Sequence, residues 1–157
     1  MKKYIHYGHT YFDIELFKPM QNNPMFTKPS GGLWGSPIDA TYGWKDWCRD
    51  NEFREIDKND CFEFQICSEA NVLHLYSIDD VDKLPKQKGL TIGSMEYLDF
   101  EQIKIDGYDA IELHLSEDRS SDCLYGLYYV LYGWDCDSIL VMNPNCIVVD
   151  RKLNGKI

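Results

Sequence analysis

Short stretches of this chain alternate apolar and polar residues with a period of two, which is the spacing of a half-buried β-strand. Residues 61–67 are the clearest case, because Phe62, Phe64 and Ile66 are each followed by a polar residue or a cysteine. Similar apolar stretches bounded by Gly, Pro and Asn predict further strands. These strands are expected at residues 3–8, 31–36, 72–76, 108–115, 138–142 and 146–149.

Helical segments are fewer and shorter than the strands. Asp39 is a candidate N-cap for a helix over residues 40–51, which carries Tyr42, Trp44 and Trp47. Short helices are also expected at residues 79–84 and 99–105, a helix or a strand at 124–132, and a polar loop at 86–91. Because no regular βαβ rhythm is present, we predict an α+β fold with a largely antiparallel sheet, in a single domain that spans residues 1–157.

The charge balance restricts the partners of the protein. The chain has 157 residues, with 26 Asp and Glu against 16 Lys and Arg, and a formal net charge of −10. This balance argues against a broad nucleic-acid surface or an anionic membrane surface. No apolar stretch approaches the ~18 residues of a membrane-spanning helix. Polar residues follow Met1 where a signal peptide needs an apolar stretch, so we expect a cytoplasmic protein.

The cysteines and histidines do not form a recognisable metal-binding motif. No two of the six cysteines have the Cys-x-x-Cys spacing, so we expect buried, reduced thiols, with zinc ligation or a catalytic cysteine as alternatives. The four histidines do not form a His-Glu-x-x-His helix. We therefore expect no metal site, and a metal shared by His6 and His9 is the weaker alternative. Dinucleotide-binding Gly-x-Gly-x-x-Gly and P-loop motifs are absent as well.

Three segments carry aromatic and polar residues in an informative order. The first is residues 4–9, Tyr-Ile-His-Tyr-Gly-His, at the end of the first expected strand. The second is residues 32–37, Gly-Leu-Trp-Gly-Ser-Pro, which the aromatic helix follows. The third is residues 134–145, in which Asp137 precedes the apolar residues of a late strand. Glu112 adds a second acid on an earlier strand.

This order resembles the ADP-ribosyltransferase superfamily in its His–aromatic–acid branch, which includes diphtheria-toxin-like enzymes and the poly(ADP-ribose) polymerases. Those proteins carry a His-Gly near the end of the first strand, a Gly-Ile-Tyr-Phe-Ala-like strand, an aromatic-bearing helix and an acid that opens a late apolar strand. The resemblance extends from about Tyr4 to Val149, and the phrases Gly-Tyr-Asp-Ala-Ile and Asp-Ser…Asn-Pro-Asn are also similar to bacterial and phage transferases of this fold. It implies a split antiparallel β-sheet core flanked by short helices, with NAD as the substrate.

The resemblance also implies roles for the residues that would bind NAD. His6 would contact the adenosine ribose, and the backbone of Tyr7 would pair with the nicotinamide amide. Trp34 would line or stack on the nicotinamide pocket, because an aromatic face suits a flat ring. Tyr42 or Trp44 would form the second aromatic wall.

A carboxylate near the glycosidic bond can stabilise the oxocarbenium-like charge that develops when nicotinamide leaves. On the resemblance, Asp137 is the first candidate for this catalytic acid and Glu112 is the second. Ser36 would support the site through a hydrogen bond.

Three residues depart from the family pattern. The family's His-Gly is here His-Tyr-Gly, so Gly8 and His9 are alternatives for the backbone clamp and the ribose contact. Trp34 replaces a Tyr, and Asp137 replaces a Glu that is one methylene longer. The branch of the superfamily that uses a first-strand Arg is disfavoured, because the first expected strand contains no Arg.

The sequence therefore predicts an NAD-dependent mono-ADP-ribosyltransferase that transfers ADP-ribose to a macromolecule. A protein acceptor fits the acidic chain better than nucleic acid does, and basic nucleic-acid-binding proteins are one class that such a chain can bind. An NAD glycohydrolase or an RNA 2′-phosphotransferase-like enzyme on the same fold are alternatives. A further alternative is a catalytically degenerate interaction domain, which would bind a protein through the Tyr-rich residues 124–134.

Overall fold

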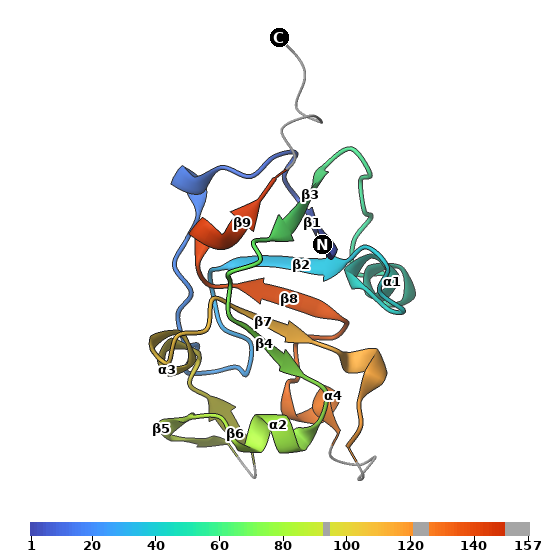
Figure 1. Cartoon of the computed structure of the whole chain (residues 1–157). Helices are drawn as coiled ribbons and strands as arrows, with labels where there is room; N and C mark the ends of the chain where they lie inside the picture. The colour runs from blue at the N-terminus through green and yellow to red at the C-terminus, as the bar shows by residue number, and fades with distance from the viewer. Residues whose placement is uncertain (93–94, 121–125, 150–157) are drawn as a thin grey trace.

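A computed structural model describes residues 1–92, 95–120 and 126–149 of the chain. A curled sheet forms the centre of the molecule, and short helices and a two-stranded hairpin lie around it (Figure 1). The predicted α+β class is thereby confirmed. The seven-stranded sheet has the order β4 (Val72–Leu75), β7 (Ala110–Leu113), β8 (Ser138–Val141), β2 (Leu33–Pro37), β1 (Lys3–Tyr7), β3 (Cys61–Ile66) and β9 (Ile147–Val148).

The strand pairing is antiparallel throughout this sheet except between β4 and β7, which run parallel. The hairpin consists of β5 (Lys86–Ile92) and β6 (Met95–Leu98). The helices are α1 (Trp44–Asp50), α2 (Ile78–Asp82), α3 (Phe100–Ile105) and α4 (Leu127–Val130). Single 3₁₀ turns occur at Ile14–Leu16, Leu115–Glu117 and Pro144–Cys146. No helix of residues 1–92, 95–120 and 126–149 is long and apolar enough to span a membrane.

The sheet separates two apolar clusters. Leu140, Ile111 and Leu113 belong to one cluster, whereas Ile139 and Val141 belong to the other. Because successive side chains of a strand point to opposite faces, β7 and β8 are buried on both sides. This double burial explains why residues 138–142 form a continuous apolar run instead of an alternating one.

Two predictions about individual elements are wrong. Residues 86–91 belong to β5 and do not form a loop, because their backbone pairs with β6. The sequence of this segment has no alternation of apolar residues from which a strand could be predicted. The aromatic helix begins at Trp44 and not near Asp39, since Gly43 is its N-cap and the hydroxyl of Ser36 accepts a hydrogen bond from the Trp44 N–H. Residues 124–125 of the segment predicted as helix or strand lie outside the described residues, and α4 forms within the remainder.

Gly35 lies at the centre of β2, where β1 and β8 pair on either side. A Cβ atom at this position would lie 2.9 Å from the ring of Phe64 and 3.1 Å from the carbonyl oxygen of Ile5. Phe64 is 1% exposed, so its ring cannot move aside easily. Glycine is therefore required here for packing, although alanine would ordinarily be the better strand residue.

We predict that Gly35→Ala lowers the free energy of unfolding by about 2 kcal/mol, because it overpacks this contact. Phe64→Leu in the same chain should recover part of the loss, since the smaller side chain makes room for the methyl group. Urea unfolding of the two single variants and the double variant measures the coupling. Additive losses, within about 0.5 kcal/mol, would contradict the proposed contact.

Candidate functional site

The strands that carry the three sequence segments lie next to one another, in the order β8, β2 and β1. A cavity of about 220 Å³ opens where these strands meet the start of α1. Five of the residues predicted to bind NAD line it: His6, Tyr7, Trp34, Ser36 and Trp44. The pairing of the strands therefore brings Ile5 of β1 and Ser138 of β8, which are 133 positions apart in the chain, to one cavity.

His6 has a defined proton arrangement. Its Nδ1 atom lies 2.7 Å from the carbonyl oxygen of Trp34, which can only accept, so Nδ1 carries the hydrogen. Burial lowers the pKa of His6 from its ordinary value, because the charged ring would lose hydration. The neutral ring then has Nε2 as an acceptor, which lies 3.2 Å from Nδ1 of His9. A hydroxyl group that replaced His9 would find an acceptor at the same atom.

Aromatic rings form the walls of the cavity. Trp34 meets Trp134 edge-on, with a centroid separation of 4.8 Å, and Trp44 stacks on Trp47 at 5.1 Å. The ammonium group of Lys28 lies 4.5 Å from the centre of the Trp34 ring. Burial lowers the pKa of Lys28. The face of Trp34 is thus a site that already attracts a cation.

Ser36 joins two elements at the edge of the cavity. Its hydroxyl oxygen accepts a hydrogen bond of 2.9 Å from the Trp44 N–H and so joins β2 to α1. Tyr42 is not among the residues that line the cavity. Burial, together with a hydrogen bond between its phenol and Asp50, raises the pKa of Tyr42.

Asp137 directly precedes β8, and its side chain does not line the cavity. Cys136 and Ser138, its neighbours on either side, both line the cavity, whereas Asp137 does not. Its carboxylate accepts hydrogen bonds from the backbone N–H (2.8 Å) and hydroxyl (2.7 Å) of Ser116 and from the N–H of Tyr42 (3.3 Å). The carboxylate therefore ties the start of β8 to the turns at Ser116 and Tyr42.

Glu112 lies on the opposite face of the sheet from the cavity. It is 1% exposed, and it accepts a hydrogen bond of 3.0 Å from the Tyr4 hydroxyl. The ammonium group of Lys2 lies 2.5 Å from its other oxygen. Glu112 is not among the described residues that line the cavity, whereas Trp34 is.

A second cavity, of about 400 Å³, lies on the other side of His6. His6 lines both cavities, and His9, Phe12 and Phe62 line the second one. Gly8 lines neither cavity, and its N–H donates to the carbonyl oxygen of Asp60. The two cavities therefore lie next to each other, and His6 lines both of them.

Sequence reasoning missed seven of the residues that line the first cavity, which are Ile5, Lys28, Gly35, Arg54, Trp134, Cys136 and Ser138. A signal existed for two of them, because a period of two places Cys136 and Ser138 on one face and Asp137 on the other. The indole N–H of Trp134 is buried and has no hydrogen-bond partner among the described residues, which only the folded chain reveals. Lys28 lies in a loop rich in Pro and Asn, and no periodicity marks it.

A comparison with protein-family models, with curated proteins and with solved structures found no match. The arguments about function therefore depend on the chemistry of the described residues.

The thiol of Cys136 should be unreactive in the folded protein. Burial raises its pKa to about 12, so the reactive thiolate is scarce at pH 8. We predict that iodoacetamide modifies Cys136 at least about 100-fold more slowly in the native protein than in urea. Cys67 is partly exposed and serves as the internal control. Peptide mass spectrometry over time measures both rates, and equal labelling of the two residues would contradict the burial of Cys136.

The lowered pKa of His6 gives its contribution to stability a definite pH dependence. The unfolded chain binds a proton at His6 more readily than the folded chain does, so this contribution is present at pH 7.5 and decreases as the pH falls below about 6.5. We predict that the free energy of unfolding decreases less between pH 7.5 and pH 5.5 in His6→Gln than in the unaltered chain. Urea unfolding at both values tests this, and an unchanged or steeper loss in the variant would disprove it.

Proposed function

We propose that this protein is an NAD-dependent mono-ADP-ribosyltransferase with an ADP-ribosyltransferase-like split sheet, and that the nicotinamide half of NAD occupies the cavity between β1, β2 and β8. One observation carries the proposal. His6, Trp34 and the residues flanking Asp137 come from the three segments on which the resemblance depends, and they line one cavity. The β8–β2–β1 order of the sheet supports the same fold.

The charge and shape of the cavity suit nicotinamide. The nicotinamide ring of NAD is flat and carries a positive charge, and Lys28 already holds a cation over the face of Trp34. A bound ring would take the place of this ammonium group over Trp34. Lys28 and Arg54 would then be available for the diphosphate, because both line the cavity and carry positive charge.

The shared position of His6 suits a ligand with two halves. Nicotinamide in the first cavity places the remaining nucleotide toward the second cavity, past His6. Nε2 of His6 is an acceptor, because Nδ1 donates to Trp34, so it can accept a hydrogen bond from a ribose hydroxyl. This is the role that the family resemblance gives to the histidine.

In the proposed reaction, the bond between the ribose carbon and the nicotinamide nitrogen breaks, and its electron pair leaves with nicotinamide. A nucleophilic side chain of the acceptor protein forms the new bond to the ribose carbon and releases its proton to solvent. The positive charge that develops on the ribose would lie among the aromatic faces of Trp34 and Trp44. We assign Asp137 a positioning role, since its carboxylate holds the strand segment that presents Cys136 and Ser138.

Purified protein should bind NAD and release nicotinamide, and Trp34→Ala should weaken NAD binding at least about tenfold through the loss of stacking. Tyr128→Ala is the control, because Tyr128 lies exposed on α4, away from the cavity. Calorimetry measures the affinity for NAD, and chromatography measures the nicotinamide released.

Release stimulated by a cell lysate, with label on a discrete protein, identifies a transferase, whereas unstimulated release identifies a glycohydrolase. Absence of NAD binding by folded protein would refute the proposal.

The two acids are compared in the same assay. For a positioning role of Asp137, Asp137→Ala and Ser116→Ala should lower nicotinamide release and melting temperature together, because each removes hydrogen bonds at the start of β8. Release abolished in an Asp137→Asn variant of unchanged melting temperature would instead indicate a catalytic acid. The same result for Glu112→Gln would assign that role to Glu112.

A second candidate is an interaction domain that has kept the nucleotide cavity without the cleavage reaction. The observation in its favour is that none of the described residues lining the first cavity carries a carboxylate. Tyr128, Tyr129 and Tyr132 are 53%, 42% and 63% exposed on and beside α4, and such aromatic surfaces are common in protein interfaces. NAD binding without nicotinamide release, under every condition including added lysate, would favour this candidate.

A further inference from the structure

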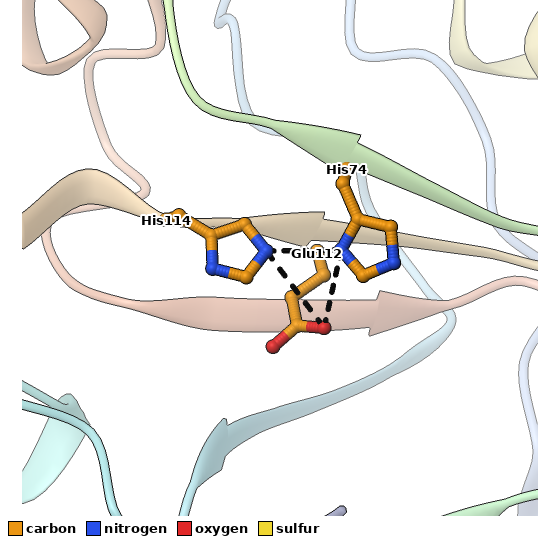
Figure 2. A group of neighbouring side chains, drawn as sticks. All are labelled: His74, Glu112 and His114. Carbon is orange, nitrogen blue, oxygen red and sulfur yellow. Dashed lines mark hydrogen bonds and ion pairs between the residues drawn. The ribbon is translucent and has the colours of Figure 1, made fainter. Parts of the chain in front are cut away.

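Three side chains that can bind a metal ion lie close together on the face of the sheet opposite the first cavity, in which we propose that NAD binds. His74 lies on β4, Glu112 lies on β7, and His114 follows β7 directly. The parallel pairing of the two strands places His74 opposite Glu112, and alternation places His114 on the same face as Glu112. Figure 2 shows the three side chains pointing toward one another.

The separations between the three ligand atoms suit a small cation. Nδ1 of His74 lies 2.9 Å from Nε2 of His114, and Oε2 of Glu112 lies 3.5 Å from the first atom and 3.9 Å from the second. A point equidistant from these three atoms lies about 2.0 Å from each of them, which is the ordinary length of a zinc–nitrogen or zinc–oxygen bond. This point lies in the plane of the three atoms, so small side-chain shifts would complete a tetrahedral arrangement with water in the fourth position.

The contact between the two histidines is a place where a cation can replace a proton. The two ring nitrogens lie 2.9 Å apart, so one of them carries a hydrogen and donates it to the other, which is unprotonated. A metal ion bound by both nitrogens removes the need for that hydrogen. The carboxylate of Glu112 then supplies negative charge directly beside the ion.

Neighbouring groups fix the orientation of the ligands. The ring of Tyr76 stacks on His114 with centroids 4.0 Å apart, and Tyr4 donates a hydrogen bond to Glu112. Lys2 holds Oε1 of Glu112, and Oε2 accepts the Tyr4 hydrogen bond with one lone pair, so its second lone pair is the one available to an ion. Nδ1 of His114 lies 4.0 Å from a carboxylate oxygen of Glu117, which is too far for a hydrogen bond but close enough for ionic attraction.

An ion can reach this position from solvent. The side chain of His74 is 46% exposed, whereas those of His114 and Glu112 are 10% and 1% exposed. His74 also lines an open groove of about 410 Å³. The cluster is thus buried on one side and open on the other, as a metal site with three protein ligands and one water requires.

We propose that Nδ1 of His74, Nε2 of His114 and Oε2 of Glu112 bind one divalent ion of the zinc class, with water in the fourth position. Two histidines and one carboxylate are a ligand set that zinc accepts. Hard cations such as Mg²⁺ prefer oxygen ligands and fit the two ring nitrogens poorly. The site is separate from the NAD cavity, so it is tested independently of the proposed enzyme activity.

The chain contains a matched comparison for this cluster. His6 and His9 also lie in contact, with ring nitrogens 3.2 Å apart, but no carboxylate is paired with them among the described residues. His9 is exposed and lies outside β1, so a substitution there changes no strand residue. His9→Ala therefore tests whether any pair of neighbouring histidines is sufficient. Cys67→Ser is a second control, because Cys67 lines the same groove as His74.

The experiment is calorimetric titration of the full chain with Zn²⁺ alone, and with Mg²⁺ for comparison. We expect one Zn²⁺ per chain, and His74→Ala should weaken its binding by at least about 100-fold because a direct ligand is lost. His114→Phe, which keeps an aromatic ring beside Tyr76, should do the same. His9→Ala and Cys67→Ser should bind Zn²⁺ as the unaltered chain does.

The visible spectrum of the Co²⁺-loaded protein supplies a second readout. Strong visible absorption bands typical of four-coordinate Co²⁺ should be present in the unaltered chain and lost in His74→Ala. Circular dichroism shows that each variant is folded. No stoichiometric Zn²⁺ binding, unchanged binding in both His74→Ala and His114→Phe, or a loss that instead follows His9→Ala or Cys67→Ser would each overturn the proposal.

Discussion

The position of β2 in the sheet is the constraint on which both the fold and the candidate site depend. Its backbone pairs with β1 on one side and with β8 on the other. Chain segments more than 100 residues apart are thereby held within two strand spacings of each other. Gly35 permits this arrangement, because any side chain there would meet Phe64. Without this double pairing, His6, Trp34 and Ser138 would not line one cavity.

The two faces of the sheet separate two kinds of chemistry. One face, where β1, β2 and β8 meet, presents aromatic rings and the cations Lys28 and Arg54, an arrangement suited to a flat ring and a diphosphate. The other face presents His74, Glu112 and His114, an arrangement suited to a metal ion. Both depend on the alternation of side chains along a strand, which sends neighbouring residues to opposite sides.

Buried carboxylates connect the elements of this protein through their hydrogen-bond partners. An unpartnered charge inside a protein is costly, so each buried acid must be matched by donors. Asp137 receives donors from Ser116 and Tyr42, and Glu112 receives them from Tyr4 and Lys2. In the sequence, both residues stand out as acids beside apolar strands. That pattern alone does not distinguish an acid that stabilises the fold from a catalytic one.

The sequence by itself determined the α+β class and most of the strands, because hydrophobic periodicity is a local property. Trp34, Trp44 and Ser36, which line the cavity, were candidates through the family resemblance and not through periodicity. Only the tertiary structure decided the pairing of β5 with β6 and the approach of His74 to His114, 40 residues away. Strand pairing brings distant residues together through backbone hydrogen bonds, which every residue except proline can make, so no side-chain pattern announces such contacts.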